Sequence, residues 1–158
     1  MWSRAVPALL SLLILSCGTP LTQLVAVVSS DLTGVTAIRV RSLRADADVE
    51  EELSSVVVRL EGGTALPVAV AVEPFDLMDI GRVIVEAEAQ NAMGQRIVAR
   101  RATTEFREGE QLALPLSLRE SCRRVMCPSG NTCGEMGCAT QEVPVSSLTS
   151  FEGVVDAP

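Results

Sequence analysis

The sequence predicts a mostly β protein: an antiparallel, immunoglobulin-like β-sandwich followed by a small disulfide-stapled module. Three observations lead to this prediction. Between residues 24 and 119, short runs rich in valine and leucine recur about every 10–20 residues, with turn residues between them. Several of these runs alternate between apolar and polar side chains, as strands with one buried face do. Four of the five cysteines lie within 17 residues, from Cys122 to Cys138.

The first three predicted strands are short apolar runs that end at turn residues. Residues 24–28 precede a Ser-Ser-Asp turn, and residues 35–40 alternate aliphatic side chains with arginines. Residues 44–52 carry many charges, and we interpret them as a solvated loop. Residues 56–60 form another apolar run, which a Gly-Gly pair closes. These segments predict the first half of a sandwich.

The second half is predicted from a strand over residues 66–72 and a long hairpin. Pro74 ends the strand, because proline cannot continue a central strand. The hairpin arms are residues 82–89 and 95–104, with the turn at 91–94. In the first arm, the side chains expected to face the core are Val83, Val85, Ala87 and Ala89. The side chains expected to form Glu–Arg pairs on the exposed face are Glu86, Glu88, Arg96, Arg100 and Arg101.

The last predicted strand, residues 112–118, shows the clearest alternation. Its four leucines face one side, and Pro115 on the other side indicates an edge strand. The domain length of about 100 residues is usual for an immunoglobulin-like sandwich. The Cys–Trp–Cys core of true immunoglobulin domains is missing, so the prediction concerns the architecture alone. A small β-barrel is the competing architecture.

The composition excludes several classes of chemistry. The 158 residues include 13 arginines but no lysine, histidine or tyrosine, and the net charge is −7. Without histidine there is no Ser-His-Asp triad and no histidine-bound metal. Without lysine there is no Schiff-base or Walker-type chemistry. An acidic chain with few aromatic residues is also a poor nucleic-acid binder.

Residues 1–16 have the features of a signal peptide. Arg4 supplies the positive charge, and an apolar run of 11 residues follows, from Ala5 to Leu15. This run is shorter than the roughly 20 residues that a transmembrane helix needs. It ends in Ile-Leu-Ser-Cys, which resembles the bacterial lipobox. The resemblance implies lipid attachment to Cys17 and cleavage before it; a plain signal peptide is the alternative.

The short segment that holds the four C-terminal cysteines needs covalent or metal cross-links, because it cannot bury a core of its own. Their spacing is wider than the pairs typical of zinc sites, and an exported chain meets an oxidising compartment, so two disulfides are favoured over zinc. Sequence alone leaves three pairings open. The cluster is similar to small EGF-like half-modules, and this likeness implies Cys122–Cys133 with Cys127–Cys138.

The order of lipobox, β-rich domain and short cysteine-rich module resembles predicted surface lipoproteins of myxobacteria. The motifs that carry the resemblance are structural, and the group brings no defined activity with it. The domains expected are a signal peptide (1–16), an anchor and linker (17–23), the sandwich (24–119), the cysteine-rich module (120–139) and a flexible tail (140–158). Lipid on Cys17 would hold the chain at a membrane without a transmembrane helix.

Two charged groups are candidate sites, and each has a simpler interpretation. The carboxylates within residues 73–79 could bind Ca²⁺ or act in acid–base chemistry, although a solvated loop is favoured. Arg100-Arg101 and Arg123-Arg124 could contact lipid phosphates, although salt bridges or solvated positions are favoured. Residues 46–57 depart from the calcium-loop pattern at its glycine and at its final glutamate. We therefore expect no catalytic residues, metal or cofactor.

The sequence thus leads us to expect an exported, non-enzymatic envelope protein. It would be anchored to the outer membrane through Cys17, since no aspartate follows that cysteine, and would face the periplasm or the cell surface. Its role would be structural, adhesive or binding, with an envelope protein as partner and neither nucleic acid nor a small-molecule substrate. The alternative is a secreted or surface-bound protease inhibitor that uses the disulfide-rich loop.

Overall fold

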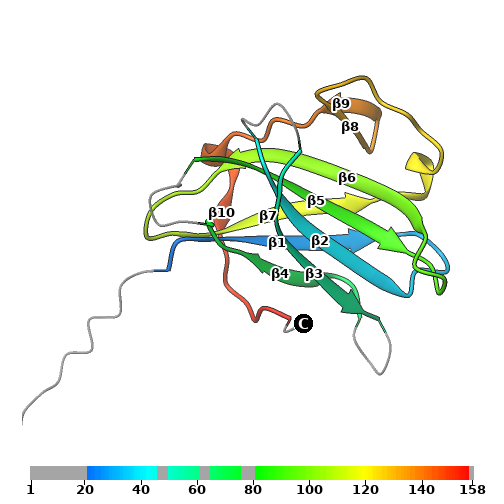
Figure 1. Ribbon diagram of the computed structural model, residues 1–158, viewed down its shortest axis with the longest axis horizontal. Coiled ribbons are helices and arrows are strands. Elements are labelled where there is room, and N and C mark those ends of the chain that lie inside the picture. Colours follow the sequence, from blue (N-terminus) through cyan, green and yellow to red (C-terminus); the bar gives the residue numbers. More distant parts are fainter. Residues whose placement is uncertain (1–20, 46–49, 61–64, 76–80, 157–158) are drawn as a thin grey trace, which may run out of the picture.

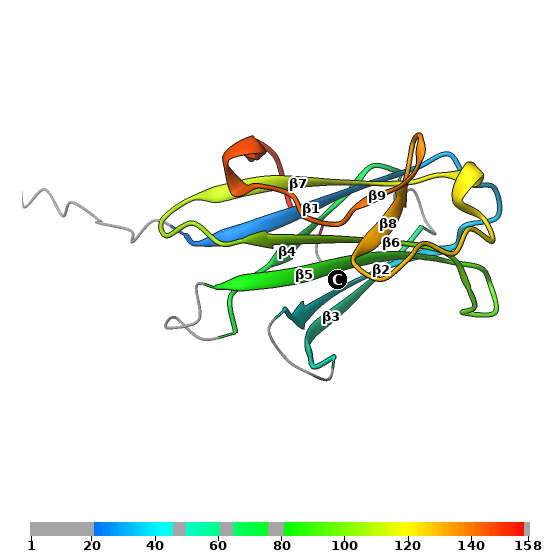
Figure 2. The ribbon, with the colours of Figure 1, turned by 90° about the horizontal axis from the view of Figure 1, so that it is seen from above.

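Two four-stranded sheets packed face to face form the body of the protein (Figure 1, Figure 2). The computed structural model describes residues 21–45, 50–60, 65–75 and 81–156. One sheet has the strand order β10-β7-β1-β4 and the other β3-β2-β5-β6, while β8 and β9 form a separate hairpin. The predicted sandwich and its stapled module are therefore confirmed. Within the described ranges, no helix has the length and apolar character to cross a membrane.

The strands follow the predicted apolar runs closely. In chain order they are β1 (Gln23–Ser30), β2 (Ala37–Arg44), β3 (Glu52–Arg59), β4 (Val68–Val72), β5 (Arg82–Gln90), β6 (Arg96–Glu105), β7 (Gln111–Leu118), β8 (Asn131–Gly134), β9 (Gly137–Thr140) and β10 (Thr149–Ser150). Two 3₁₀ turns complete the set, η1 (Glu120–Cys122) and η2 (Val145–Ser147). The turn between β5 and β6 is held by the Asn91 side chain, which accepts hydrogen bonds from the backbone N–H groups of Met93 and Gln95.

The predicted solvated loop over residues 44–52 is shorter than expected. Arg44 ends β2 and Glu52 begins β3, because ion pairs across the two strands extend the ladder. Arg39 and Arg41 both bind Glu52, at N–O distances of 3.1 and 3.4 Å. Arg44 binds Glu51 at 2.8 Å. Charges that indicate a loop in the sequence therefore pair on the outer face of the sheet.

The core lies between the sheets and is built from aliphatic side chains. The alternation predicted for β5 and β7 places the expected residues inside. The buried set from these two strands is Val83, Val85, Ala87, Ala89, Leu112, Leu114, Leu116 and Leu118. Ile38 and Val40 of β2 are buried too, whereas Arg39 and Arg41 lie on the outer face, as predicted. Burial of this aliphatic surface is the main force that holds the two sheets together.

One strand pair runs parallel in an otherwise antiparallel sandwich. β1 pairs with β4 antiparallel and with β7 parallel, over Gln23–Ser30 and Gln111–Leu118. Parallel neighbours need a long crossover connection, and here the five intervening strands provide it. β10 pairs with β7 only at Leu112 and Ala113, so Pro115 lies beyond it. From Pro115 onward, β7 is therefore an edge strand, as the proline predicted.

The prediction that Glu86 and Glu88 face solvent is wrong. Their exposed fractions are 1% and 8%. Glu86 does pair with Arg101 across β5 and β6, as the hairpin pattern predicted. It also binds Arg41 of β2, so both carboxylate oxygens are occupied by arginines and removed from water.

The prediction of a flexible tail over residues 140–158 is wrong for residues 140–156. This segment contacts the edge strand β6 first, then β7, and finally the edge strand β4. Thr103 of β6 exchanges backbone hydrogen bonds with Gln141 and Val143. β10 then pairs with β7, and Asp156 bonds to Ala69 of β4. The segment is ordered because unpaired backbone groups at sheet edges need partners.

Candidate functional site

Two disulfides define the C-terminal module. Cys122 pairs with Cys133 and Cys127 with Cys138, each closing a separation of 11 residues. These are the pairings that the likeness to EGF-like half-modules implied. Cys17, the predicted lipidation site, lies outside the described residues.

The module is seated on the sandwich rather than extending from it. Cys122 and Cys133 are buried and belong to the main hydrophobic core. The Thr132 hydroxyl accepts a hydrogen bond of 3.0 Å from the Arg101 backbone N–H on β6. Arg119 binds Glu135, and its contact with Asp31 at 3.5 Å links the module to the loop after β1. Figure 1 shows the β8–β9 hairpin beside β6.

Glu86 is the centre of a charged network on the outer face of the β3-β2-β5-β6 sheet. Its carboxylate accepts a hydrogen bond of 2.7 Å from Nε of Arg41 and another from Nε of Arg101. Arg101 also binds Glu50, which precedes β3. Two arginines thus neutralise one buried carboxylate and join β2, β5 and β6 side by side. A buried charge is tolerated only with such partners.

The network shifts the pKa of its members. The hydrogen bond to Glu50, helped by Glu86, raises the pKa of Arg101. Burial would lower the pKa of Arg41, but its hydrogen bond and charge interaction with Glu86 raise it overall. The bond from Arg101 lowers the pKa of Glu50 from its ordinary 4.5. This pairing therefore stabilises the fold fully above pH 4.5, and the contribution is lost as the pH falls through the lower folded-state pKa.

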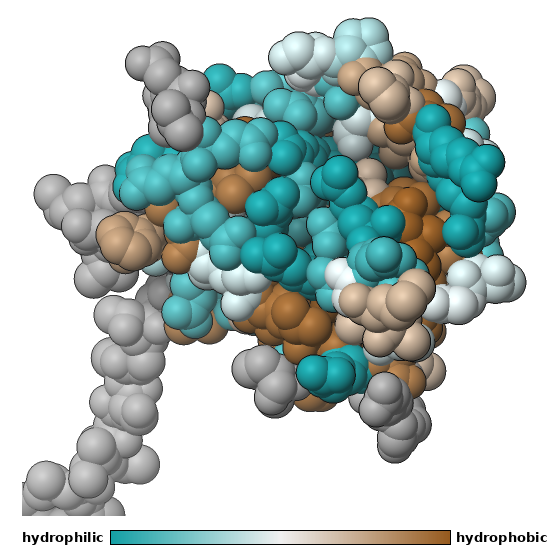
Figure 3. All heavy atoms as spheres, turned by 45° about the vertical axis from the view of Figure 1, so that its right-hand side comes forward, coloured by the Kyte–Doolittle hydropathy of each residue, from teal (hydrophilic) through white to brown (hydrophobic). Residues whose placement is uncertain are grey.

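A polar groove separates the module from the outer face of β5 and β6. Its volume is about 820 Å³, and module residues 122–133 form one wall. Arg96 of β6 and Arg124 of the module both line it. Arg124 adopts a φ of 66°, in the left-handed region that arginine rarely occupies. Figure 3, which brings this end of the molecule forward, shows mostly hydrophilic side chains with apolar patches between them.

The predicted basic spots differ in their surroundings. Arg101 and Arg123 form salt bridges, the latter with Glu120, as the favoured interpretation held. Arg100 is half-buried and donates a hydrogen bond of 3.3 Å to the Ser117 carbonyl, and burial lowers its pKa. Only Arg124 of these residues faces the polar groove without a carboxylate partner among the described residues.

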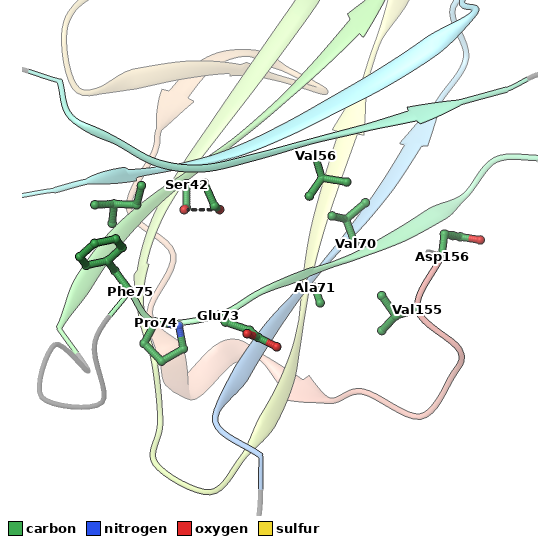
Figure 4. Close-up of a pocket in the computed structure, with 11 residues that line it drawn as sticks. Ser42, Val56, Val70, Ala71, Glu73, Pro74, Phe75, Val155 and Asp156 are labelled. Atoms are coloured by element: carbon green, nitrogen blue, oxygen red, sulfur yellow. Dashed lines mark hydrogen bonds between the residues drawn. The ribbon is translucent and has the colours of Figure 1, made fainter. Parts of the chain in front are cut away.

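A second groove, of about 560 Å³, opens between β3 and β4 at one side of the sandwich. Figure 4 shows Val56 of β3 and Val70 of β4 pointing toward one another across it. Phe75 lies at one end, and Val155 and Asp156 of the C-terminal segment at the other. Ser42 and Ser54 form a hydrogen bond of 2.7 Å along its wall. Most of the described residues that line the groove are apolar and none of them is an arginine, so it suits an apolar occupant.

The described residues contain no cluster of three metal-binding side chains. Glu73 lines the second groove, whereas its predicted companions at positions 76 and 79 lie outside the described residues. Neither groove could be predicted from the sequence, because each is formed by segments far apart in the chain. No protein-family model, curated protein or solved structure matches this chain. The functional assignment therefore depends on the chain's own residues.

The two disulfides should contribute unequally to stability. Both close loops of the same length, so chain entropy assigns each about 3 kcal/mol. Cys122 and Cys133 are also buried in the core, whereas Cys138 is exposed. The double variant Cys122→Ala/Cys133→Ala should therefore lose more unfolding free energy in urea than Cys127→Ala/Cys138→Ala. Equal losses would show that the first pair adds nothing through packing.

Glu86→Gln should destabilise the protein strongly, because it removes the buried charge that Arg41 and Arg101 share and leaves them only the more exposed Glu52 and Glu50 as partners. The expected loss is about 3 kcal/mol in urea unfolding at neutral pH. Glu88→Gln on the same strand is the matched control. Glu88 is also buried but accepts its bond from the neutral amide of Gln90, so the loss should be smaller. Equal losses of unfolding free energy in the two variants would show that the charge of Glu86 does not hold the network together.

Proposed function

We propose that this protein is a lipid-anchored bacterial envelope protein with a structural, adhesive or binding role and no catalytic activity. It would be exported, held at the outer membrane by lipid on Cys17, and would present its stapled module to a protein partner. The observation that carries the proposal is the pair of disulfides in the C-terminal module. Disulfides persist in oxidising compartments outside the cytoplasm.

The cysteine inventory supports the same proposal. Five cysteines are present, and the two disulfides use four of them. The remaining one, Cys17, ends the Ile-Leu-Ser-Cys motif after the apolar run. A lipidated Cys17 would leave no free thiol in an oxidising compartment. Two or three acyl chains on one residue anchor a protein firmly, whereas one chain binds only marginally.

The direction of β1 relates the anchor to the module. β1 begins at Gln23, six positions after Cys17, and the backbone N–H that follows its last residue bonds to Leu118, the last residue of β7 before the module. The eight residues of β1 span about 25 Å. An anchor at Cys17 would therefore hold the Gln23 end near the membrane and direct the opposite end, with the base of the module, away from it.

The intact mass of the membrane-extracted protein tests the proposal. The wild-type chain should begin at Cys17, carry the mass of acyl groups there and gain four hydrogens when its two disulfides are reduced. Cys17→Ser is the control and should lose the acyl mass and the membrane association. A wild-type chain with an unmodified Cys17, or one that leaves the membrane without detergent, would contradict the proposal.

A second candidate function, protease inhibition, is favoured by two exposed methionines. Met136, in the turn between β8 and β9, is fully exposed, and Met126, next to Cys127, is 92% exposed. Disulfides bound both segments and would keep them rigid in a protease active site. Titration of serine proteases with the purified chain tests this role. Inhibition at a 1:1 ratio that Met126→Asp or Met136→Asp abolishes would support it, and unhindered proteolysis would exclude it.

A further inference from the structure

The segment after β7 covers three of the four edges of the two sheets. The edge of β6 is bonded by Thr132 and by residues 141–143, and the edge of β7 is paired with β10. At the edge of β4, the Ala69 N–H donates to the Asp156 carboxylate at 2.7 Å, and the Asp156 N–H donates to the Ala69 carbonyl. The fourth edge, β3, has no neighbour on its outer side among the described residues.

The open edge of β3 presents a regular row of backbone groups. Leu60 N–H donates to the Thr36 carbonyl at 2.9 Å, which fixes the phase of the ladder between β2 and β3. Alternate residues of an antiparallel strand bond to the same neighbour. Val58, Val56 and Ser54 therefore bond toward β2. The N–H and C=O groups of Ser55, Val57 and Arg59 point outward, to the side where no strand lies.

Apart from a register shift near its start, where Leu53 has no partner in β2, β3 lacks the devices that usually protect an exposed edge. Natural edges carry lysine, proline or central charges, or are very short. β3 has eight residues, and its six central positions are uncharged and contain no proline. Val57 at the middle is 43% exposed. The apolar groove of Figure 4 borders the inner side of the same strand through Leu53 and Val56.

The charges of β3 match a second copy of the same strand in antiparallel orientation. Glu50, Glu51 and Glu52 lie at its start, and Arg59 ends it. Antiparallel pairing near Ser55 brings the acidic start of one copy beside Arg59 of the other, twice by symmetry. Parallel pairing would instead bring like charges together. Arg59 has no carboxylate partner among the described residues that would compete for it.

We propose that β3 is the dimer interface of this protein. Two copies pair antiparallel through their outward backbone groups, so that the β3-β2-β5-β6 sheet continues into the same sheet of the second copy. The symmetric contact satisfies Ser55 and Val57 in both chains and covers the apolar groove beside Leu53 and Val56. This inference is independent of lipid anchoring and of the module's partner.

The test is sedimentation velocity and native mass spectrometry of the full chain in mild detergent over a micromolar concentration range. The wild type should form dimers. Val57→Pro removes one outward N–H per copy while leaving the β2 ladder intact, and it should weaken dimerisation about tenfold or more. Val57→Thr, which keeps the N–H, is the matched control and should dimerise like the wild type. Repeating the measurement on Cys17→Ser separates dimer formation from anchoring.

A second variant covers the case in which Val57→Pro fails to fold. Arg59→Glu changes one exposed side chain and places like charges opposite one another at both ends of the interface, so it should also weaken the dimer, and more so at low salt. A wild type that remains monomeric throughout would overturn the proposal and leave the edge to a strand of another protein. A dimer unaffected by both Val57→Pro and Arg59→Glu would overturn it as well.

Discussion

The need of sheet edges for hydrogen-bond partners organises this structure. Without the short β10, seven strands form the two sheets, and each sheet would leave two rows of backbone groups open to water or to other chains. The segment after β7 has little core of its own, yet it is ordered because it runs along those rows. It bonds to β6 through Gln141 and Val143, pairs with β7 through β10, and ends beside Ala69 of β4.

The cysteine-rich module is held to the β3-β2-β5-β6 sheet through Arg101 of β6. The backbone N–H of Arg101 holds Thr132 of the module, while the side chain of Arg101 binds Glu86 and Glu50. One residue thus ties the module, the buried carboxylate and the approach to β3 together. Because Cys122 and Cys133 lie in the main core, the module is a continuation of the sandwich and not a separate body. A partner bound at the module would therefore contact a rigid surface.

The sequence allowed the strands and the core to be predicted, and the likeness to EGF-like half-modules implied the disulfide pairing, but the surfaces could not be predicted. Alternation in residues 112–118 has one physical interpretation, a strand with one buried face, and the structure agrees. The burial of Glu86 could not be predicted, because it depends on Arg41, 45 positions away in the chain. The order of residues 140–156 was missed for a similar reason. Hydrogen bonds to distant strand edges hold that segment, and local composition carries no sign of them.

Residue-resolved hydrogen exchange tests most directly the central claim that three edges are covered by the chain itself and one by a second copy. The amide groups of Ala69, Thr103 and Phe151 bond across the covered edges and should be protected at every protein concentration. Those of Ser55 and Val57 should exchange quickly in dilute samples and become protected as dimers form. Rapid exchange at Thr103 and Ala69, or protection of Val57 that does not depend on concentration, would contradict the account.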